Sequence, residues 1–252
     1  MSLKLLATFV SLLSVVNAAL IPTSFILIGD STTAVTSGWG PGFCGESQRS
    51  LASVLEPETP CFDDAKGGAT TVSFLSDGSW DKAVAHIKQE VAKNRRTLVT
   101  IQFGHNDSHR STKEVMHRDL TNMVQQIRDL KADPILVTSL VRRDFDANGK
   151  VVYDLEPWAN VTTTVAKEQN THYIDLHGAS HEYCEAIGPA ASHRLNPTSA
   201  DTTHLNPHGM VVFGRMVADL IDKDYGLIGI NLLPFVPNRE LSYNISHGIP
   251  SY

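Results

Sequence analysis

Residues 97–107 read TLVTIQFGHND, and this stretch decides the fold expected for the chain. Its first part, 97–103, is mainly apolar and β-branched, which is typical of a strand buried on both faces. Gly104 ends the apolar run, and the polar sequence His-Asn-Asp follows at 105–107. The stretch therefore predicts a buried strand with polar side chains at its carboxyl end.

On both sides of this strand, short apolar runs alternate with stretches whose apolar residues recur at helical spacing. Such alternation predicts an α/β fold, with parallel strands and helices on both faces of the sheet. In sheets of this kind the ligand site lies at the carboxyl ends of the strands. The expected strands are 24–28, 61–65, 97–103, 134–140 and 172–176, and the expected helices are 43–55, 80–91, 116–130, 157–169 and one that begins at Pro207.

The length and composition indicate a folded, globular chain. It has 252 residues, of which 42% are hydrophobic and 19% are charged, as in ordinary globular domains. Residues 1–18 differ, because Lys4 precedes an apolar run at 5–16 and a small-residue cleavage pattern ends at Ala18. This pattern is typical of a secretory signal peptide, and the run is short for the alternative, a membrane anchor. We expect a secreted, extracellular protein with one domain over residues 19–252.

The charge excludes one class of partner. The net charge is −6 at pH 7, and the sequence has no basic run that would bind a nucleic-acid backbone. After residue 18 no segment is apolar enough to span a bilayer. We expect a monomer that binds neither nucleic acid nor a membrane.

The three cysteines are Cys44, Cys61 and Cys184. Secretion makes a disulfide possible, and an odd count leaves one cysteine free or paired between chains. Cys44 and Cys61 are the nearest pair in sequence and would close a loop worth about 3 kcal/mol of stability. None of the spacings is typical of a zinc site.

Two glycosylation acceptors are consistent with export, at Asn160-Val-Thr and Asn244-Ile-Ser. Asn106-Asp-Ser also fits the acceptor pattern. We expect Asn106 to remain unmodified, because a glycan there would block the site described next.

The residues that could carry out chemistry lie in four separate segments, 29–32, 67–70, 104–107 and 201–204. Three of them follow expected strands, and the fourth precedes the last helix, so all can meet at one edge of the sheet. Ser31, between a strand and an expected helix, is the candidate nucleophile. His204 is the candidate base, and Asp201 can orient its imidazole.

Candidate donors to a negatively charged tetrahedral intermediate accompany this set. Such an intermediate needs two or three donors, and Ser31 N–H, Gly68 N–H and the Asn106 side chain supply them. Each motif alone has a simpler interpretation, as a helix cap, a loop glycine or a turn former. His105 and His109 are spaced for a metal, but no third ligand is near in sequence, so we expect neither a metal nor a cofactor.

Together the segments resemble the SGNH (GDSL-type) hydrolase superfamily, whose four letters correspond to Ser31, Gly68, Asn106 and His204. Within it the chain looks most like fungal enzymes of the rhamnogalacturonan acetylesterase type. The resemblance implies a flavodoxin-like three-layer α/β/α sandwich, no metal, and a triad of Ser31, His204 and Asp201. The resembling segments are GDSTTA (29–34), GWG (38–40), GATTVSF (68–74), IQFGHND (101–107), ILVTSLVRR (135–143), THLN (203–206) and VVFGRMVADL (211–220).

The second of the four segments, taken here as residues 64–70 and called the second block, departs from the pattern N-x-A-x-x-G-R-S that is usual in the related enzymes. In this chain Lys66 and Ala69 change the expected wall of the site. The departure concerns the substrate more than the ester chemistry. Arg142 and Arg143, after the fourth strand, would suit a uronate in the substrate, or they form a solvated pair in a loop.

The resulting expectation is a secreted serine esterase that removes short acyl groups, foremost acetyl, from a plant cell-wall polysaccharide such as rhamnogalacturonan, or from a small ester. Two alternatives remain at this point. One is a secreted lipase or phospholipase of the same superfamily, and the other is a carbohydrate-binding protein that keeps the fold without turnover.

Overall fold

The structure is a computed structural model that describes residues 22–225 and 233–251. The expected signal peptide, 1–18, lies outside the described residues. At the centre is a five-stranded sheet in the order β2-β1-β3-β4-β5, with every neighbouring pair parallel. The expected α/β fold with a five-stranded parallel sheet is confirmed. The strands are β1 (Thr23–Gly29), β2 (Cys61–Asp63), β3 (Arg96–Gln102), β4 (Asp133–Val137) and β5 (His172–Ile174).

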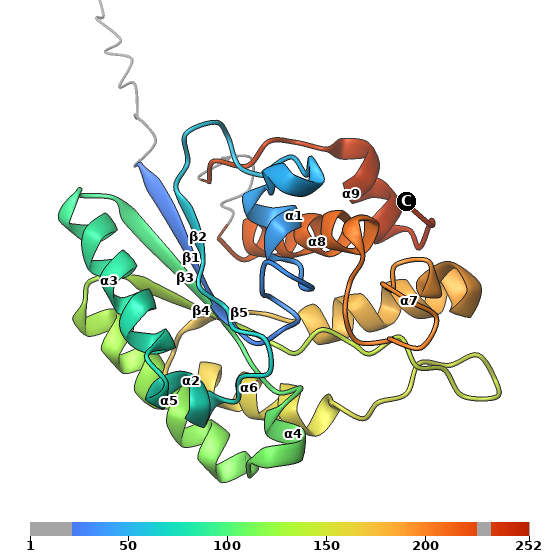
Figure 1. The fold of residues 1–252 in the computed structure, drawn as a ribbon, viewed down its shortest axis with the longest axis horizontal. Helices are drawn as coiled ribbons and strands as arrows, with labels where there is room; N and C mark the ends of the chain where they lie inside the picture. The colour runs from blue at the N-terminus through green and yellow to red at the C-terminus, as the bar shows by residue number, and fades with distance from the viewer. Residues whose placement is uncertain (1–21, 226–232, 252) are drawn as a thin grey trace, which may run out of the picture.

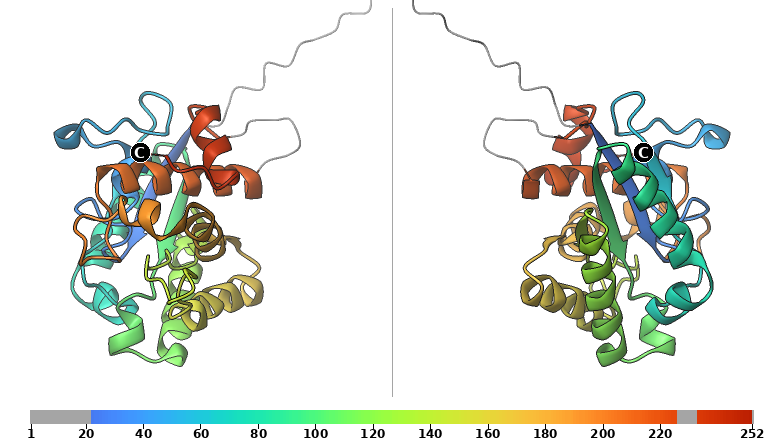
Figure 2. Two further views of the ribbon diagram at one scale, coloured as in Figure 1. Left: turned by 90° about the vertical axis from the view of Figure 1, so that its right-hand side faces the viewer. Right: turned by 90° about the vertical axis from the view of Figure 1, so that its left-hand side faces the viewer.

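Helices cover both faces of the sheet, which makes three layers (Figures 1 and 2). One layer holds α3 (Ser79–Ala92), α5 (Lys113–Asp129) and α6 (Glu156–Glu168), and the other holds α1 (Gly40–Cys44), α7 (Leu176–His193) and α8 (Pro207–Tyr225). The short helices α2 (Thr71–Ser76) and α4 (Asp107–Arg110) lie near the ends of α3 and α5, and α9 (Arg239–Ser246) packs against α8.

Alternate residues of β1 enter opposite cores. Phe25 and Leu27 join the cluster that contains Phe213 of α8, whereas Ile26 and Ile28 join the cluster that contains Leu120 of α5. Side chains alternate between the faces of a strand, so a strand covered on both faces must be mainly apolar. This is why the central strands are recognisable in the sequence as mainly apolar runs.

The register between β1 and β3 determines where the segments that follow these strands begin. β1 and β3 pair along their whole length, from Thr23 opposite Arg96 to Gly29 opposite Gln102. The chain therefore leaves both strands at the same level and on the same edge of the sheet.

The expected helix over 43–55 is wrong. α1 ends at Cys44, and Gly45 follows with φ at 83°, which breaks the helical path. A short 3-10 turn (Ser47–Arg49) and loop segments occupy the rest, and Leu55 forms an isolated bridge with Phe235. The apolar residues that suggested a helix reach the core from a loop instead.

Helix α7 was missed, because the sequence there predicted only the end of a strand. Gly188 and Pro189 interrupt the helix near its end, and this pair hides the helical spacing on either side. The expected strand over 134–140 is also shorter in the structure, since β4 ends at Val137.

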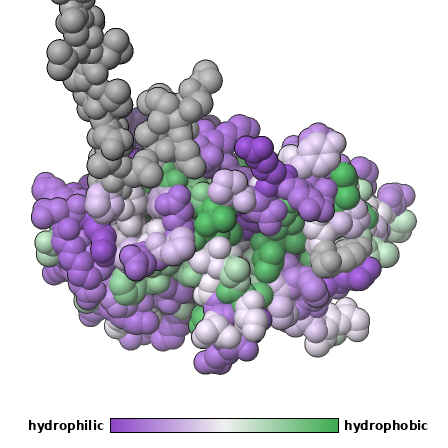
Figure 3. Space-filling model, turned by 90° about the horizontal axis from the view of Figure 1, so that it is seen from above, coloured by the Kyte–Doolittle hydropathy of each residue, from purple (hydrophilic) through white to green (hydrophobic). Residues whose placement is uncertain are grey.

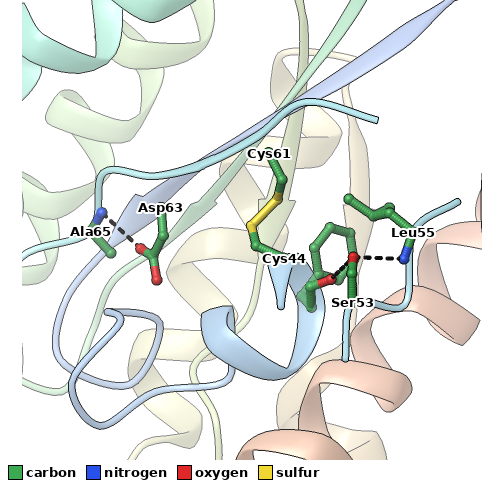
Figure 4. The surroundings of a disulfide bond; sticks show 7 residues. Cys44, Ser53, Leu55, Cys61, Asp63 and Ala65 are labelled. Carbon is green, nitrogen blue, oxygen red and sulfur yellow. Dashed lines mark hydrogen bonds between the residues drawn. A yellow bond between two sulfur atoms is a disulfide. The ribbon is translucent and has the colours of Figure 1, made fainter. Parts of the chain in front are cut away.

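A disulfide joins Cys44 at the end of α1 to Cys61 in β2, with 5.4 Å between the Cα atoms (Figure 4). This is the pair that sequence proximity favoured. Cys184 is buried and has no disulfide partner. The bridge fixes the short edge strand to the helical layer.

The face seen in Figure 3 is mainly hydrophilic, with apolar residues gathered towards its middle. None of the helices in the described ranges has the combined length and apolar character that a bilayer span requires. The large apolar side chains most exposed in these ranges belong to Tyr243 (55%) and Tyr153 (52%).

One carboxyl group beside the disulfide predicts how stability depends on pH. Asp63 Oδ1 accepts a hydrogen bond from Ala65 N–H at 3.1 Å (Figure 4). Although the residue is partly exposed, its Oδ2 atom is buried without a hydrogen-bond partner in the described chain. Burial raises the pKa of Asp63 from 3.8 to about 8.

The folded protein therefore keeps the Asp63 proton over a pH range in which the unfolded chain has lost it. Between about pH 4 and 8 the folded state binds more protons, so the free energy of unfolding should fall as pH rises. We expect Asp63→Asn to remove more than half of the decline between pH 5 and 8 in urea titrations. Asp30, whose pKa is raised to about 6, should account for part of the remainder.

Asp77→Asn is the matched control for that experiment. Hydrogen bonds with Lys66 and Ser79 lower the pKa of Asp77 to about 2, so this group is ionised in both states above pH 5. Its removal should leave the slope unchanged. An Asp63→Asn protein with the wild-type slope would contradict the assignment.

Candidate active site

Ser31 lies in a tight turn two residues beyond the end of β1. The backbone N–H groups of Thr33 and Ala34 both donate to Asp30 O, at 3.2 and 3.0 Å. Asp30 Oδ1 accepts from Thr32 N–H at 2.9 Å and from its hydroxyl at 2.8 Å. No helix begins directly after Ser31, because turns continue from Ser31 until α1 begins at Gly40.

A buried side chain of β3 holds this turn. Gln102 Oε1 accepts hydrogen bonds from Thr33 Oγ1 at 2.7 Å and from Trp39 Nε1 at 2.5 Å. All three side chains are fully buried. The strand that leads to Asn106 therefore also positions the turn that carries Ser31.

Asp201, His204 and Ser31 form a continuous line of hydrogen bonds. His204 Nε2 lies 2.9 Å from Ser31 Oγ, and His204 Nδ1 lies 2.9 Å from Asp201 Oδ2. Asp201 Oδ1 also accepts the backbone N–H groups of Thr203 (3.1 Å) and His204 (2.9 Å). The Asp201 carboxylate thus holds the backbone of residues 201–204 in a turn and also orients the His204 imidazole. Burial acts to raise the pKa of Asp201, but its hydrogen bonds with His204 outweigh this and lower the pKa overall.

The segments of Gly68 and Asn106 are joined to one another. Asp107 Oδ1 accepts the Thr71 N–H at 3.0 Å and its hydroxyl at 2.8 Å. Arg110 Nη1 donates to Gly68 O at 3.2 Å. These contacts run from α4 to Thr71, at the start of α2, and to Gly68. They fix two candidate oxyanion donors, Gly68 and Asn106, relative to each other.

The Asn106 amide has no acceptor within the described protein, and Gly68 faces open space. Asn106 Nδ2 is buried and has no acceptor among the described residues, a state that costs about 1–3 kcal/mol when nothing compensates it. Gly68 has φ at 75°, and a Cβ atom added there would meet nothing within 4 Å. The space beside Gly68 is therefore open, as the approach of a substrate requires.

His105 and His109 do not share a position suited to one metal ion. His105 is buried, with Nδ1 3.8 Å from Asp30 Oδ2, whereas the exposed His109 has Nε2 3.2 Å from Arg142 Nη2. Burial, followed by the charges of Arg142 and Arg143, holds the pKa of His105 well below its usual value. In residues 22–225 and 233–251 no group of three or more His, Cys, Asp or Glu side chains is placed to hold a metal.

Arg143 is not the surface residue that the sequence suggested. It is fully buried, so it cannot contact a uronate, and that expectation is corrected. Its Nη2 donates to His204 O at 2.5 Å, its Nε donates to Asn196 Oδ1, and its backbone N–H donates to Thr202 O at 2.8 Å. Arg143 therefore holds the loop of the candidate base. Arg142 is partly exposed and is paired with Asp154.

Sequence reasoning missed Thr71, Arg110 and Asp154 as supports of the site. Asp107 lies in the motif IQFGHND (101–107), but the motif did not indicate its role. Its hydrogen bonds with Thr71 show that it joins α4 to α2. Nothing in the sequence marks Arg110 or Asp154, because their contacts join segments far apart along the chain.

Residues 27–212 match the GDSL-like Lipase/Acylhydrolase family. The chain belongs to this family. It is 32% identical over 241 residues to the rhamnogalacturonan acetylesterase RhgT of Bacillus subtilis (strain 168), a match that covers 87% of this chain and 96% of that protein.

Solved structures share the fold of this GDSL-like acylhydrolase. The Bacillus subtilis protein YXIM superposes with a TM-score of 0.64 at 22% identity, over 83% of this chain and only 59% of that chain. The acetylxylan esterase Axe2 from Geobacillus stearothermophilus gives 0.57 at 19% identity, over 85% and 99%. Family membership makes the chain a carboxylic ester hydrolase.

The oxyanion assignment predicts the effect of a substitution at Asn106. We expect Asn106→Ala to lower kcat by about 10²–10³-fold with little change in KM, because an oxyanion donor acts mainly on the transition state. Steady-state hydrolysis of p-nitrophenyl acetate measures both constants. A rise in KM with unchanged kcat would instead assign Asn106 to ground-state binding of the substrate.

The contacts of Arg143 also predict the effect of its removal. Arg143→Met should lower the free energy of unfolding by about 1.5–3 kcal/mol, as expected for hydrogen bonds made by a charged group, and should lower kcat. Arg142→Met, at the neighbouring arginine that is paired with Asp154, is the comparison and should lower the free energy of unfolding by less than about 1 kcal/mol, as for an ion pair close to the surface. Urea unfolding and p-nitrophenyl acetate kinetics test both. Wild-type kcat in Arg143→Met would show that His204 does not need this support.

Proposed function

We propose that this acylhydrolase is a secreted serine esterase that removes acetyl groups from a plant cell-wall polysaccharide such as rhamnogalacturonan. The observation that carries the proposal is the unbroken hydrogen-bonded line from Asp201 through His204 to Ser31. The similarity to a rhamnogalacturonan acetylesterase over 87% of the chain supports the choice of substrate.

In this mechanism Ser31 Oγ attacks the ester carbonyl carbon while its proton passes to His204 Nε2. Asp201 keeps the other ring proton on Nδ1 and stabilises the imidazolium that forms. The tetrahedral intermediate collapses to an acetyl-enzyme as His204 gives its proton to the departing sugar hydroxyl. Water then attacks the acetyl carbon with His204 again as base, which releases acetate and restores Ser31.

The oxyanion of each intermediate is assigned to Ser31 N–H, Gly68 N–H and Asn106 Nδ2. The unpaired Asn106 amide and the open space at Gly68 support this assignment. Donors that are fixed before the reaction stabilise the developing charge without further reorganisation. No cofactor has a part in these steps.

The departure in the second block has little effect on this chemistry. Ala69 is buried, with 2% of its surface exposed, so it contributes to the core rather than to the site wall. Lys66 is paired with Asp77 at 2.8 Å. Neither residue opposes the acetyl-ester assignment.

Three features support secretion and glycosylation. Residues 1–18 have the pattern of a signal peptide, and the disulfide of Cys44 with Cys61 suits an oxidising compartment. The acceptor Asn160 is exposed on α6, and Asn244 is partly exposed on α9. Asn106 should remain unmodified, because its Nδ2 atom is buried. A monomer without nucleic-acid or membrane partners completes the proposal.

The proposal predicts two results for the purified protein. Wild type should release acetate from acetylated rhamnogalacturonan, and Ser31→Ala should release none while unfolding at the same urea concentration. Among p-nitrophenyl esters, acetate should be cleaved with a kcat/KM well above octanoate, because an acyl tail with no apolar wall gains no binding energy in the transition state. A kcat/KM that rises with acyl length would favour the lipase alternative. Residual activity in Ser31→Ala would remove Ser31 as nucleophile.

A further inference from the structure

Residues 144–155 form a loop that is linked, through Arg142 just before it, to the residues on either side of Asn106. Phe145 and Val151 make an antiparallel bridge at its base. Near the carboxyl end of the loop, Asp154 is paired with Arg142. Arg142 Nη2 in turn lies 3.4 Å from His105 O and 3.2 Å from His109 Nε2. His105 directly precedes Asn106, and His109 lies in α4, which follows Asn106.

This loop is also anchored to helix α7. Lys150 Nζ lies 2.8 Å from Glu185 Oε2, and Val151 N–H donates to Glu185 Oε1 at 3.2 Å. Within the loop, Val152 N–H donates to Asp144 O at 2.9 Å. Contacts at both ends hold the exposed segment that includes Tyr153 in a defined position.

Tyr153 projects a fixed aromatic ring from that segment. Its ring centroid lies 4.0 Å from the ring of His181, with 32° between the planes, and its hydroxyl is 3.2 Å from His181 Nδ1. His181 is buried at 6% exposure, whereas Tyr153 is 52% exposed. One side of the tyrosine therefore rests on the protein, and the rest is open to solvent. A ring that is already fixed loses little conformational entropy when a ligand covers it.

We propose that Tyr153, Arg142 and Asp154 form a carbohydrate subsite next to the catalytic groups, in which the Tyr153 ring stacks on a pyranose of the polysaccharide. This inference rests on the proposed function and adds the residues that select a polymer over a small ester. A pyranose has C–H groups on its faces and hydroxyl groups around its rim. An aromatic face beside a few fixed polar groups matches that pattern. The guanidinium of Arg142 has five donors. Its contacts with Asp154, His105 O and His109 Nε2 use three of them, which leaves about two for sugar hydroxyls.

The test compares a polymer with a small ester in the same variants. The polymer is whichever of acetylated rhamnogalacturonan and acetylxylan wild type deacetylates faster, and the small ester is p-nitrophenyl acetate. We expect Tyr153→Ala to lower kcat/KM on the polymer by about tenfold, in line with the loss of one aromatic contact, while the rate on the small ester stays within about twofold. Tyr153→Phe keeps the ring and should retain most of the polymer activity.

Tyr243→Ala is the matched control. Tyr243 is 55% exposed and stacks on His247 with 3.9 Å between ring centroids, but it lies on α9. It should leave both activities unchanged. A Tyr153→Ala protein with wild-type polymer activity, or with equal losses on both substrates, would overturn the subsite. Wild type that releases no acetate from either polymer would overturn the proposed function before any variant is compared.

Discussion

The parallel pairing of β1 with β3 is the interaction on which the rest of the structure depends. All seven residues of β1 are buried, and the pairing continues to Gly29 opposite Gln102. Parallel strands release the chain at the same edge, so the turn of Ser31 and the segment of Asn106 begin side by side. Gln102 then completes the alignment through its hydrogen bonds to Thr33 and Trp39. A shift of one residue in this register would exchange the two cores and separate the catalytic groups.

Around the carboxyl edge of the sheet the protein buries polar side chains, although burial of such groups lowers stability unless their contacts compensate it. Asp30, His105 and Arg143 are all almost completely excluded from solvent, and burial alone disfavours the charged form of each. Their contacts explain why they are kept, since Asp30 shapes the nucleophile turn and Arg143 holds the loop of the base. The site is therefore supported by a layer of polar side chains beneath it, and stability is partly given up for position.

The sequence predicted the parts of this structure that depend on local pattern. β3 forms over Arg96–Gln102 because the run at 97–103 is mainly apolar and β-branched. The motifs that follow the strands meet because parallel topology requires it. The helix expected at 43–55 failed because the backbone at Gly45 leaves the helical path, and the spacing of apolar residues does not reveal this. Arg143 was misjudged for another reason. Its burial depends on the loop at 202–204, some sixty positions later, and no local pattern reports a contact of that kind.

The two outer strands of the sheet have a further consequence. β2 and β5 each contain only three residues, and the disulfide ties β2 to α1. An exposed strand edge offers unpaired backbone groups to other chains, and short edges offer few of them. The central strands, which are long, apolar and prone to associate, are thus shielded on both sides by brief neighbours. A protein built in this way should resist edge-to-edge association in concentrated solution, where no chaperone is present to separate its chains.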